Sequence, residues 1–194
     1  MHDTKERLLR AGEKLFRSQG YSGTGLKQLA KEAGAPWSSM YHFFPLGKEQ
    51  LAAEVVGYSA ELYAQMIQGA FAAYSDPADA VAAIFRAEAK MLKESEFRNG
   101  CPVASVTLDI ASTVEELRRP CADAFDLWIA TFARGLSSTG LSEEAAHNLA
   151  SYLLSSLEGA IVLSRAAKSV APLERAGSFV SETVKEKLPR RRAK

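Results

Sequence analysis

The 194-residue sequence is poor in residues that form disulfides or bind metals: it has two cysteines, Cys101 and Cys121, and three histidines. Two cysteines cannot make a disulfide framework, and no carboxylates accompany the histidines at the spacing of a metal site. We therefore predict no metal ion and no other cofactor. Both cysteines are interpreted as small buried hydrophobic residues, and a redox or thiol-sensing role stays open.

The sequence also lacks a long apolar run. No run approaches the roughly 20 residues that cross a bilayer as a helix. The N-terminal segment MHDTKERLLRAGEKLF is charged and amphipathic, without the continuous apolar core of a signal peptide. We expect a cytoplasmic protein with no membrane partner.

An excess of charge of one sign is absent as well. The net charge of +1 excludes a globally basic nucleic-acid binder, so any such surface must be local. Residues 1–48 do contain eight Lys or Arg against four Asp or Glu. The basic tail KEKLPRRRAK is interpreted as a solvated chain end. Outside that tail, positive charge thus concentrates in the first quarter of the chain.

Apolar residues recur at helical spacing along almost the whole chain, and no strand pattern or repeat is present, which predicts an all-α fold. Asp3 and Thr24 are the expected N-caps of the first two helices, and Gly20 and Gly34 supply left-handed stops. The predicted helices are short before Pro45 and long after it: one up to Gly20, then 25–33, 36–44 and 47–74, one from Pro77, one up to Gly140, and finally 142–169 and 172–188.

The spacing of Ala30, Gly34 and Met40 is the most specific local signal. A small residue suits a close crossing of two helices, a glycine suits the turn, and a methionine returns an apolar side chain to the crossing. These are the requirements of a helix-turn-helix, whose second helix enters the major groove of DNA. Any tight helical hairpin can use alanine and glycine in this way, so the pattern alone leaves both interpretations open.

Residues 4–51 extend the pattern: AGEKLFRSQGY, LAKEAG, MYHFF and the Lys-Glu pair of FPLGKEQL resemble the DNA-binding head of the TetR family of bacterial transcriptional regulators. FPLGKEQL and the later GCPVASVTLDIAS resemble the LmrA/YxaF-like branch. The resemblance implies an N-terminal three-helix head with a helix-turn-helix over residues 1–46. A larger C-terminal helical domain for ligand binding and dimerisation would cover residues 47–190.

The resemblance also implies which side chains contact DNA. Those at backbone-holding positions can donate to phosphate oxygens, and polar residues along the third helix fall where base edges are met. Trp37 departs from the family pattern, because many members carry Lys or another polar residue there. His42 has packing as its alternative role. The expected DNA-binding residues are Thr24, Lys27, Gln28, Trp37, Ser38, Ser39, Tyr41, His42 and Lys48.

The C-terminal half carries candidates for two further roles. Large apolar residues, with Glu88 and Asp109 as polar exceptions, suit an effector cavity, although core packing or an exposed helix edge are the alternatives. The last two long helices are apolar on more than one face, which suits a dimer surface unless both faces pack within one chain. The ligand-binding candidates are Tyr63, Met66, Phe85, Glu88, Asp109, Trp128 and Phe132. The dimer candidates are Tyr152, Ser156, Gly159, Ala160, Val180 and Val184.

Together these features predict a ligand-responsive transcriptional repressor that binds a palindromic operator as a homodimer and is released by a small apolar or aromatic effector. Two other classes remain open. A helical enzyme would need a nucleophile and a base, and Cys101 with His147 is the only notable pair by residue type. A carrier or protein-interaction module would keep the fold without reading DNA. We predict that the protein is not an enzyme.

Overall fold

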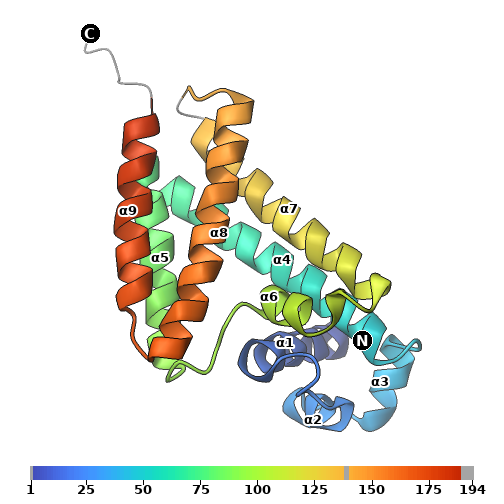
Figure 1. Cartoon of the computed structure of the whole chain (residues 1–194). Coiled ribbons are helices and arrows are strands. Elements are labelled where there is room, and N and C mark those ends of the chain that lie inside the picture. Colours follow the sequence, from blue (N-terminus) through green and yellow to red (C-terminus); the bar gives the residue numbers. More distant parts are fainter. Residues whose placement is uncertain (1, 138–139, 189–194) are drawn as a thin grey trace. The chain divides into compact units, whose positions relative to one another are not determined.

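The computed structural model describes residues 2–137 and 140–188, and within these ranges the regular structure is entirely helical, which confirms the all-α prediction. The helices are labelled in Figure 1. Their bounds are α1 His2–Gln19, α2 Leu26–Glu32, α3 Trp37–Phe43, α4 Lys48–Ala73, α5 Pro77–Glu94, α6 Pro102–Val106, the π-helical turn η1 Thr107–Ala111, α7 Glu115–Ser137, α8 Glu143–Ala167 and α9 Ala171–Lys187.

The chain forms two compact units. The first contains the chain up to Leu62 together with Arg98–Phe125, and the second contains Tyr63–Phe97 and the chain from Asp126 onward. Because α6 packs against α1, residues that follow α5 join the helix-turn-helix in the first unit. This division differs from the expected boundary between residues 46 and 47, and the assignment of those two ranges to separate functions stays a prediction.

The N-terminal head folds around side chains that the helical period places on one face. Leu8 and Phe16 of α1 are fully buried, as are Leu29 of α2 and, nearly so, Met40 of α3. Gly20 ends α1 with φ +74°, a left-handed conformation that other residues rarely adopt. The predicted crossing of α2 and α3 is therefore present, with its apolar residues inside.

Two local expectations for the first unit were wrong. Asp3 lies within the first turn of α1 and pairs with Arg7 instead of capping the helix, and Gly25 rather than Thr24 is the N-cap of α2. The sequence interpretation also missed α6 and η1, because each has only five residues and shows too short a hydrophobic period to recognise.

Helices α5, α8 and α9 run alongside one another in the second unit (Figure 1). Helices α5 and α8 begin where helices from Pro77 and from residue 142 were expected: the Asp76 side chain accepts from Ala78 N at 2.8 Å, and Ser142 Oγ accepts from Ala145 N at 3.2 Å. Ser181 Oγ on α9 donates to Ala78 O on α5 at 3.0 Å, so a buried hydroxyl joins the two helices.

Gly177 allows α9 to approach α5 closely. A Cβ at this position would lie 2.7 Å from Phe85 Cβ, well inside van der Waals contact. We expect Gly177→Ala to lower the free energy of unfolding by about 1–3 kcal/mol through overpacking, measured by urea denaturation. Gly57→Ala on α4 is the matched control: a Cβ there meets nothing within 4 Å. It should stabilise the chain by about 0.5–1 kcal/mol. Equal stability of the two variants would contradict the close approach.

Candidate nucleic-acid interface

Helix α3 presents a mixed aromatic and polar face to solvent. Trp37 is 41% exposed and Tyr41, one turn later, is 55% exposed, and their rings meet edge to face with centroids 5.5 Å apart. Ser38 and His42 are exposed too, whereas Met40 points into the core. The helix therefore carries hydrogen-bonding groups and two apolar rings on its outer side, and its inner side anchors it to the head.

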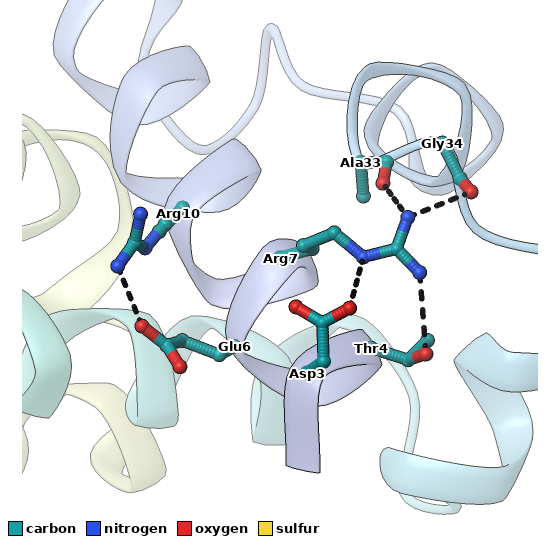
Figure 2. A network of polar contacts seen from close by, with 7 residues as sticks. All are labelled: Asp3, Thr4, Glu6, Arg7, Arg10, Ala33 and Gly34. Atoms are coloured by element: carbon teal, nitrogen blue, oxygen red, sulfur yellow. Dashed lines mark hydrogen bonds and ion pairs between the residues drawn. The ribbon is translucent and has the colours of Figure 1, made fainter. Parts of the chain in front are cut away.

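Arg7 of α1 holds the turn that leads into α3. Its Nη1 donates to Ala33 O at 3.0 Å and to Gly34 O at 3.1 Å, the two carbonyls that follow α2 (Figure 2). Thr4 Oγ1 and the Asp3 carboxylate contact the other side of the same guanidinium, at 3.3 and 3.6 Å. Since the last carbonyls of a helix have no intrahelical donor, Arg7 fixes the position from which α3 departs.

We expect Arg7→Ala to destabilise the protein by about 1–2 kcal/mol, because two carbonyls lose a charged donor that is itself partly solvated. DNA affinity should fall further than this loss of stability explains, since α3 is no longer held in one position. Thermal unfolding and fluorescence anisotropy measure the two effects. Arg10→Ala, which removes an exposed pair with Glu6 and an exposed hydrogen bond to the Tyr58 hydroxyl, is the control and should change neither quantity greatly.

The α1–α2 turn contains a network of amides. Gln19 Nε2 donates to Gly23 O at 2.8 Å and to Gln28 Oε1 at 2.8 Å, and Gln28 Nε2 donates back to Gln19 Oε1 at 3.3 Å. Gln28 and Lys27 are nevertheless exposed along α2. The two hydrogen bonds between Gln19 and Gln28 hold the Gln28 amide in one orientation. A base edge that contacts this amide therefore does not have to order the side chain.

Thr24 departs from its predicted role. Its side chain is 1% exposed, and its hydroxyl donates to Gly20 O at 2.7 Å. A buried hydroxyl whose proton is already used cannot donate to a phosphate in this conformation. We therefore assign Thr24 to the stability of the turn rather than to DNA contact.

Lys48 opens α4 beside Tyr21. Its Nζ lies 4.1 Å from the centroid of the Tyr21 ring, a cation–π contact. Burial lowers the pKa of Lys48, and the charge of Asp109 opposes that shift. The ammonium thus stands at a helix N-terminus, where the backbone dipole also favours an anion. Lys48, Tyr41 and the outer face of α3 all belong to the first unit.

The first unit thus presents a short solvent-facing helix that is held across two others, with cations beside it. Sequences of known proteins resemble this chain. Residues 8–55 match a family model described as bacterial regulatory proteins of the tetR family. Residues 77–179 match the C-terminal domain of LmrA/YxaF-like transcriptional regulators, so the matches cover most of the chain. The chain belongs to the TetR family. It is a DNA-binding transcriptional regulator, in a family of regulators and not of enzymes.

Relatives of this TetR regulator are similar over nearly their full length. YxaF of Bacillus subtilis (strain 168), an HTH-type transcriptional regulator, is 40% identical over 88% of this chain and 90% of its own. LmrA of the same organism, also an HTH-type transcriptional regulator, is 36% identical over 94% of this chain and 97% of its own. The crystal structure of a TetR regulator from Legionella pneumophila shares the fold, with a TM-score of 0.80, 24% identity, and coverage of 92% of this chain and 96% of its own.

Most of the residues expected to bind a ligand lie inside the second unit of the regulator. Trp128 and Phe132 are buried, the Tyr63 ring packs against Trp128 with centroids 4.8 Å apart, and Glu88 is 8% exposed. Phe85 is buried against α9 beside a cavity of about 450 Å³ between α5 and α9. Met66 is half-buried on α4. The structure therefore brings Tyr63 and Trp128 into ring contact and buries the Glu88 carboxylate, and the role of these residues in binding stays a prediction.

Asp109 does not join this group. It belongs to the first unit, where Ser22 N donates to its Oδ2 at 2.6 Å and Ser22 Oγ donates to its Oδ1 at 2.8 Å. Both carboxylate oxygens thus serve the head instead of an effector cavity. Sequence reasoning also missed Arg7, Ser22 and Tyr21, since their partners lie on other elements and no motif marks them.

The dimer candidates separate into two groups. Ala160, Val180 and Val184 are buried within the chain itself, so their side chains cannot meet a second copy, and we withdraw them. Tyr152 and Gly159 are exposed on α8, and Ser156 is half-buried. Periodicity did not single out Val162, Leu163 and Phe179, which the structure exposes on the same two helices.

The residues that the structure describes contain neither a metal-binding cluster nor a membrane-spanning helix. Over 2–137 and 140–188, no three His, Cys, Asp or Glu side chains gather as a metal site would require. Within those ranges, too, none of the helices combines the length and the apolar character needed to span a bilayer.

Proposed function

We propose that this TetR regulator is a homodimeric repressor that works in the cytoplasm, binds a palindromic operator through α3 and is released by a small apolar or aromatic effector. The observation that carries the proposal is the outer face of α3, where Trp37, Ser38, Tyr41 and His42 are exposed while Met40 anchors the helix. A helix of this kind fits the major groove, and Lys48 beside it suits a phosphate.

The roles within that face follow from the chemistry of each side chain. Hydroxyl and amide groups of Ser38, Ser39 and Gln28 suit base edges, and the Trp37 ring suits the methyl group of thymine. Tyr41, His42, Lys27 and Lys48 can donate to phosphates, which hold the head in register without reading sequence. Trp37 thus gives this regulator an apolar group at a position where the family resemblance implies Lys or another polar residue.

Selection of duplexes from a random-sequence pool tests the DNA proposal. We expect an inverted repeat with half-sites about one helical turn apart, as two symmetric heads require. Binding of the selected duplex, followed by fluorescence anisotropy, should weaken steeply as salt rises. Recovery of no common sequence, or affinity indifferent to salt, would refute the proposal.

A second copy of this chain is the occupant we propose for the exposed face of α8 and α9. Val162, Leu163 and Phe179 are all more than half exposed, which is unusual for large apolar side chains on neighbouring helices. A Cβ at Gly159 would meet nothing within 4 Å, so a helix of the partner has room to approach there. TetR regulators typically dimerise, and a palindrome requires two symmetric heads.

The effector is proposed to bind among the aromatic residues of the second unit. Two ring contacts form there: Tyr63 packs against Trp128 with centroids 4.8 Å apart, and Phe71 packs against Phe132 with centroids 6.3 Å apart. An effector can release DNA only if it binds one arrangement of the protein better than the other. In a Trp37→Phe variant the remaining tryptophan is Trp128. A series of small aromatic compounds should therefore include some that quench its fluorescence and dissociate DNA at the same concentration. Quenching without release would reject this effector site.

A further inference from the structure

The turn between α1 and α2 holds a carboxylate as it would hold an external anion. One residue, Ser22, donates its backbone N–H and its hydroxyl to the two oxygens of Asp109, at 2.6 and 2.8 Å. Asp109 Oδ2 also lies close to Gly20, where φ is +74°: a Cβ built there would be in ordinary van der Waals contact with it, at 3.5 Å. The carboxylate comes from η1, 87 residues away in sequence.

Asp109 also acts on Lys48. Burial lowers the pKa of Lys48, and the negative charge of Asp109 raises it again. The pKa of Tyr21, whose ring lies under the Lys48 ammonium, is raised mainly by burial, then by the charge of Glu49 and by that of Asp109. A backbone amide and a hydroxyl therefore bind one carboxylate, and the charge of that carboxylate also acts on an ammonium. These three donor types are the ones that proteins use to hold DNA phosphates.

Building on the DNA-binding function proposed above, we propose that Ser22 and Lys48 form a phosphate-binding site that Asp109 occupies in the free regulator, so that η1 restrains DNA binding. A phosphate and a carboxylate need the same donors and repel each other, so they cannot both be held there. Binding a phosphate then requires that Asp109 leave. By linkage, any change that draws η1 away from the turn strengthens DNA binding.

The contact between Ser22 and Asp109 can open at little cost in free energy. Ser22 and Asp109 are both exposed, so water can replace either partner when the other leaves. A buried ion pair would cost far more to open. The segment that carries Asp109 is a π-helical turn, a form that is rare and concentrated at functional sites.

A purely structural role for the contact between Ser22 and Asp109 predicts the opposite change in DNA affinity. If Asp109 only ordered the turn, its removal would loosen the head and weaken DNA binding. If Asp109 occupies a phosphate site, its removal leaves the two donors of Ser22 open to a phosphate. The positive charge of Lys48 is then no longer offset by the carboxylate. The direction of the change in affinity therefore separates the two roles.

Asp109→Asn tests the proposal because it removes the charge and keeps the size of the side chain. The probes are the selected duplex and a random-sequence duplex of equal length, since a phosphate contact does not depend on sequence. Both should bind about tenfold more tightly, the effect of about one charge-assisted contact. The slope of log affinity against log salt should steepen by about 0.9 per head. Ser22→Ala in the Asp109→Asn background should reverse part of the gain.

Asp123→Asn is the matched control: it removes the same charge from an exposed position on α7 of the same unit and should leave the slope unchanged. Amide exchange at Ser22 gives a reading that needs no DNA, and it should accelerate in Asp109→Asn. Unchanged or weaker binding by Asp109→Asn, while the wild type binds both duplexes, overturns this inference alone. A wild type without salt-dependent binding overturns the proposed function and this inference with it.

Discussion

Paired substitution Leu163→Glu and Phe179→Glu is expected to convert the regulator into a monomer that no longer holds its operator. The two side chains are 61% and 64% exposed, so glutamate can replace them without disturbing the packing inside one chain. In a two-fold interface each position occurs twice, and four carboxylates would lose their water against an apolar surface. Sedimentation velocity at about 10 μM should show the mass of one chain.

The loss of dimer should appear in DNA binding as well. A palindrome is held by two heads, and the second binds at the high effective concentration set by the first, so we expect affinity to fall at least ~100-fold. Ser178→Glu is the control, because Ser178 faces the cavity between α5 and α9. It should retain the mass of a dimer. A double variant that stays dimeric at the same concentration would place the interface elsewhere.

Lys48→Ala is expected to produce the second large effect. It removes an ammonium beside the N-terminus of α4, and a symmetric dimer loses it at both heads. Affinity should fall on the order of 100-fold for every sequence, and the salt slope should flatten by about 0.9 per head. Tyr41→Phe removes one hydroxyl donor and should weaken all sequences by a smaller factor, without a change in slope. Anisotropy titrations over a salt series measure both.

Ser38→Ala provides the contrast. A hydroxyl that meets a base edge discriminates between sequences, so its removal should alter the preference among selected duplexes while the salt slope stays constant. If Ser38→Ala weakens all duplexes equally, and Lys48→Ala changes preference, the two roles have been exchanged. If none of the three variants affects binding, α3 is not the recognition helix.

The features that could be predicted from sequence are those decided within one turn of the chain. Asp76 and Ser142 cap their helices because a short polar side chain folds back on the next backbone amides. Met40 is inside because its position in the helical period requires it, whatever lies opposite. The exposed face of α3 follows from the same period, and the helix expected over residues 47–74 begins at Lys48.

The features that failed depend on partners far along the chain. Asp109 lies in an apolar stretch, which suggested a cavity, yet its partner is 87 residues earlier. Thr24 carries a hydroxyl in a turn, and only the fold shows that Gly20 O receives its proton. Val180 and Val184 form a true apolar stripe, but periodicity does not say whether the surface opposite belongs to the same chain or to a second one.

The π-helical turn η1 makes the register of Asp109 depend on chain length. Such a turn holds one residue more than an α-helical turn, so deleting one residue of Thr107–Ala111 would restore the α-helical form. Each residue of an α-helix advances about 100° around the axis. Deletion of Leu108, the residue before Asp109, would turn the carboxylate by about that angle relative to α6 and so away from Ser22. A single-codon deletion in η1 would thus move this carboxylate away with its charge intact, whereas Asp109→Asn keeps the side chain in place and removes its charge.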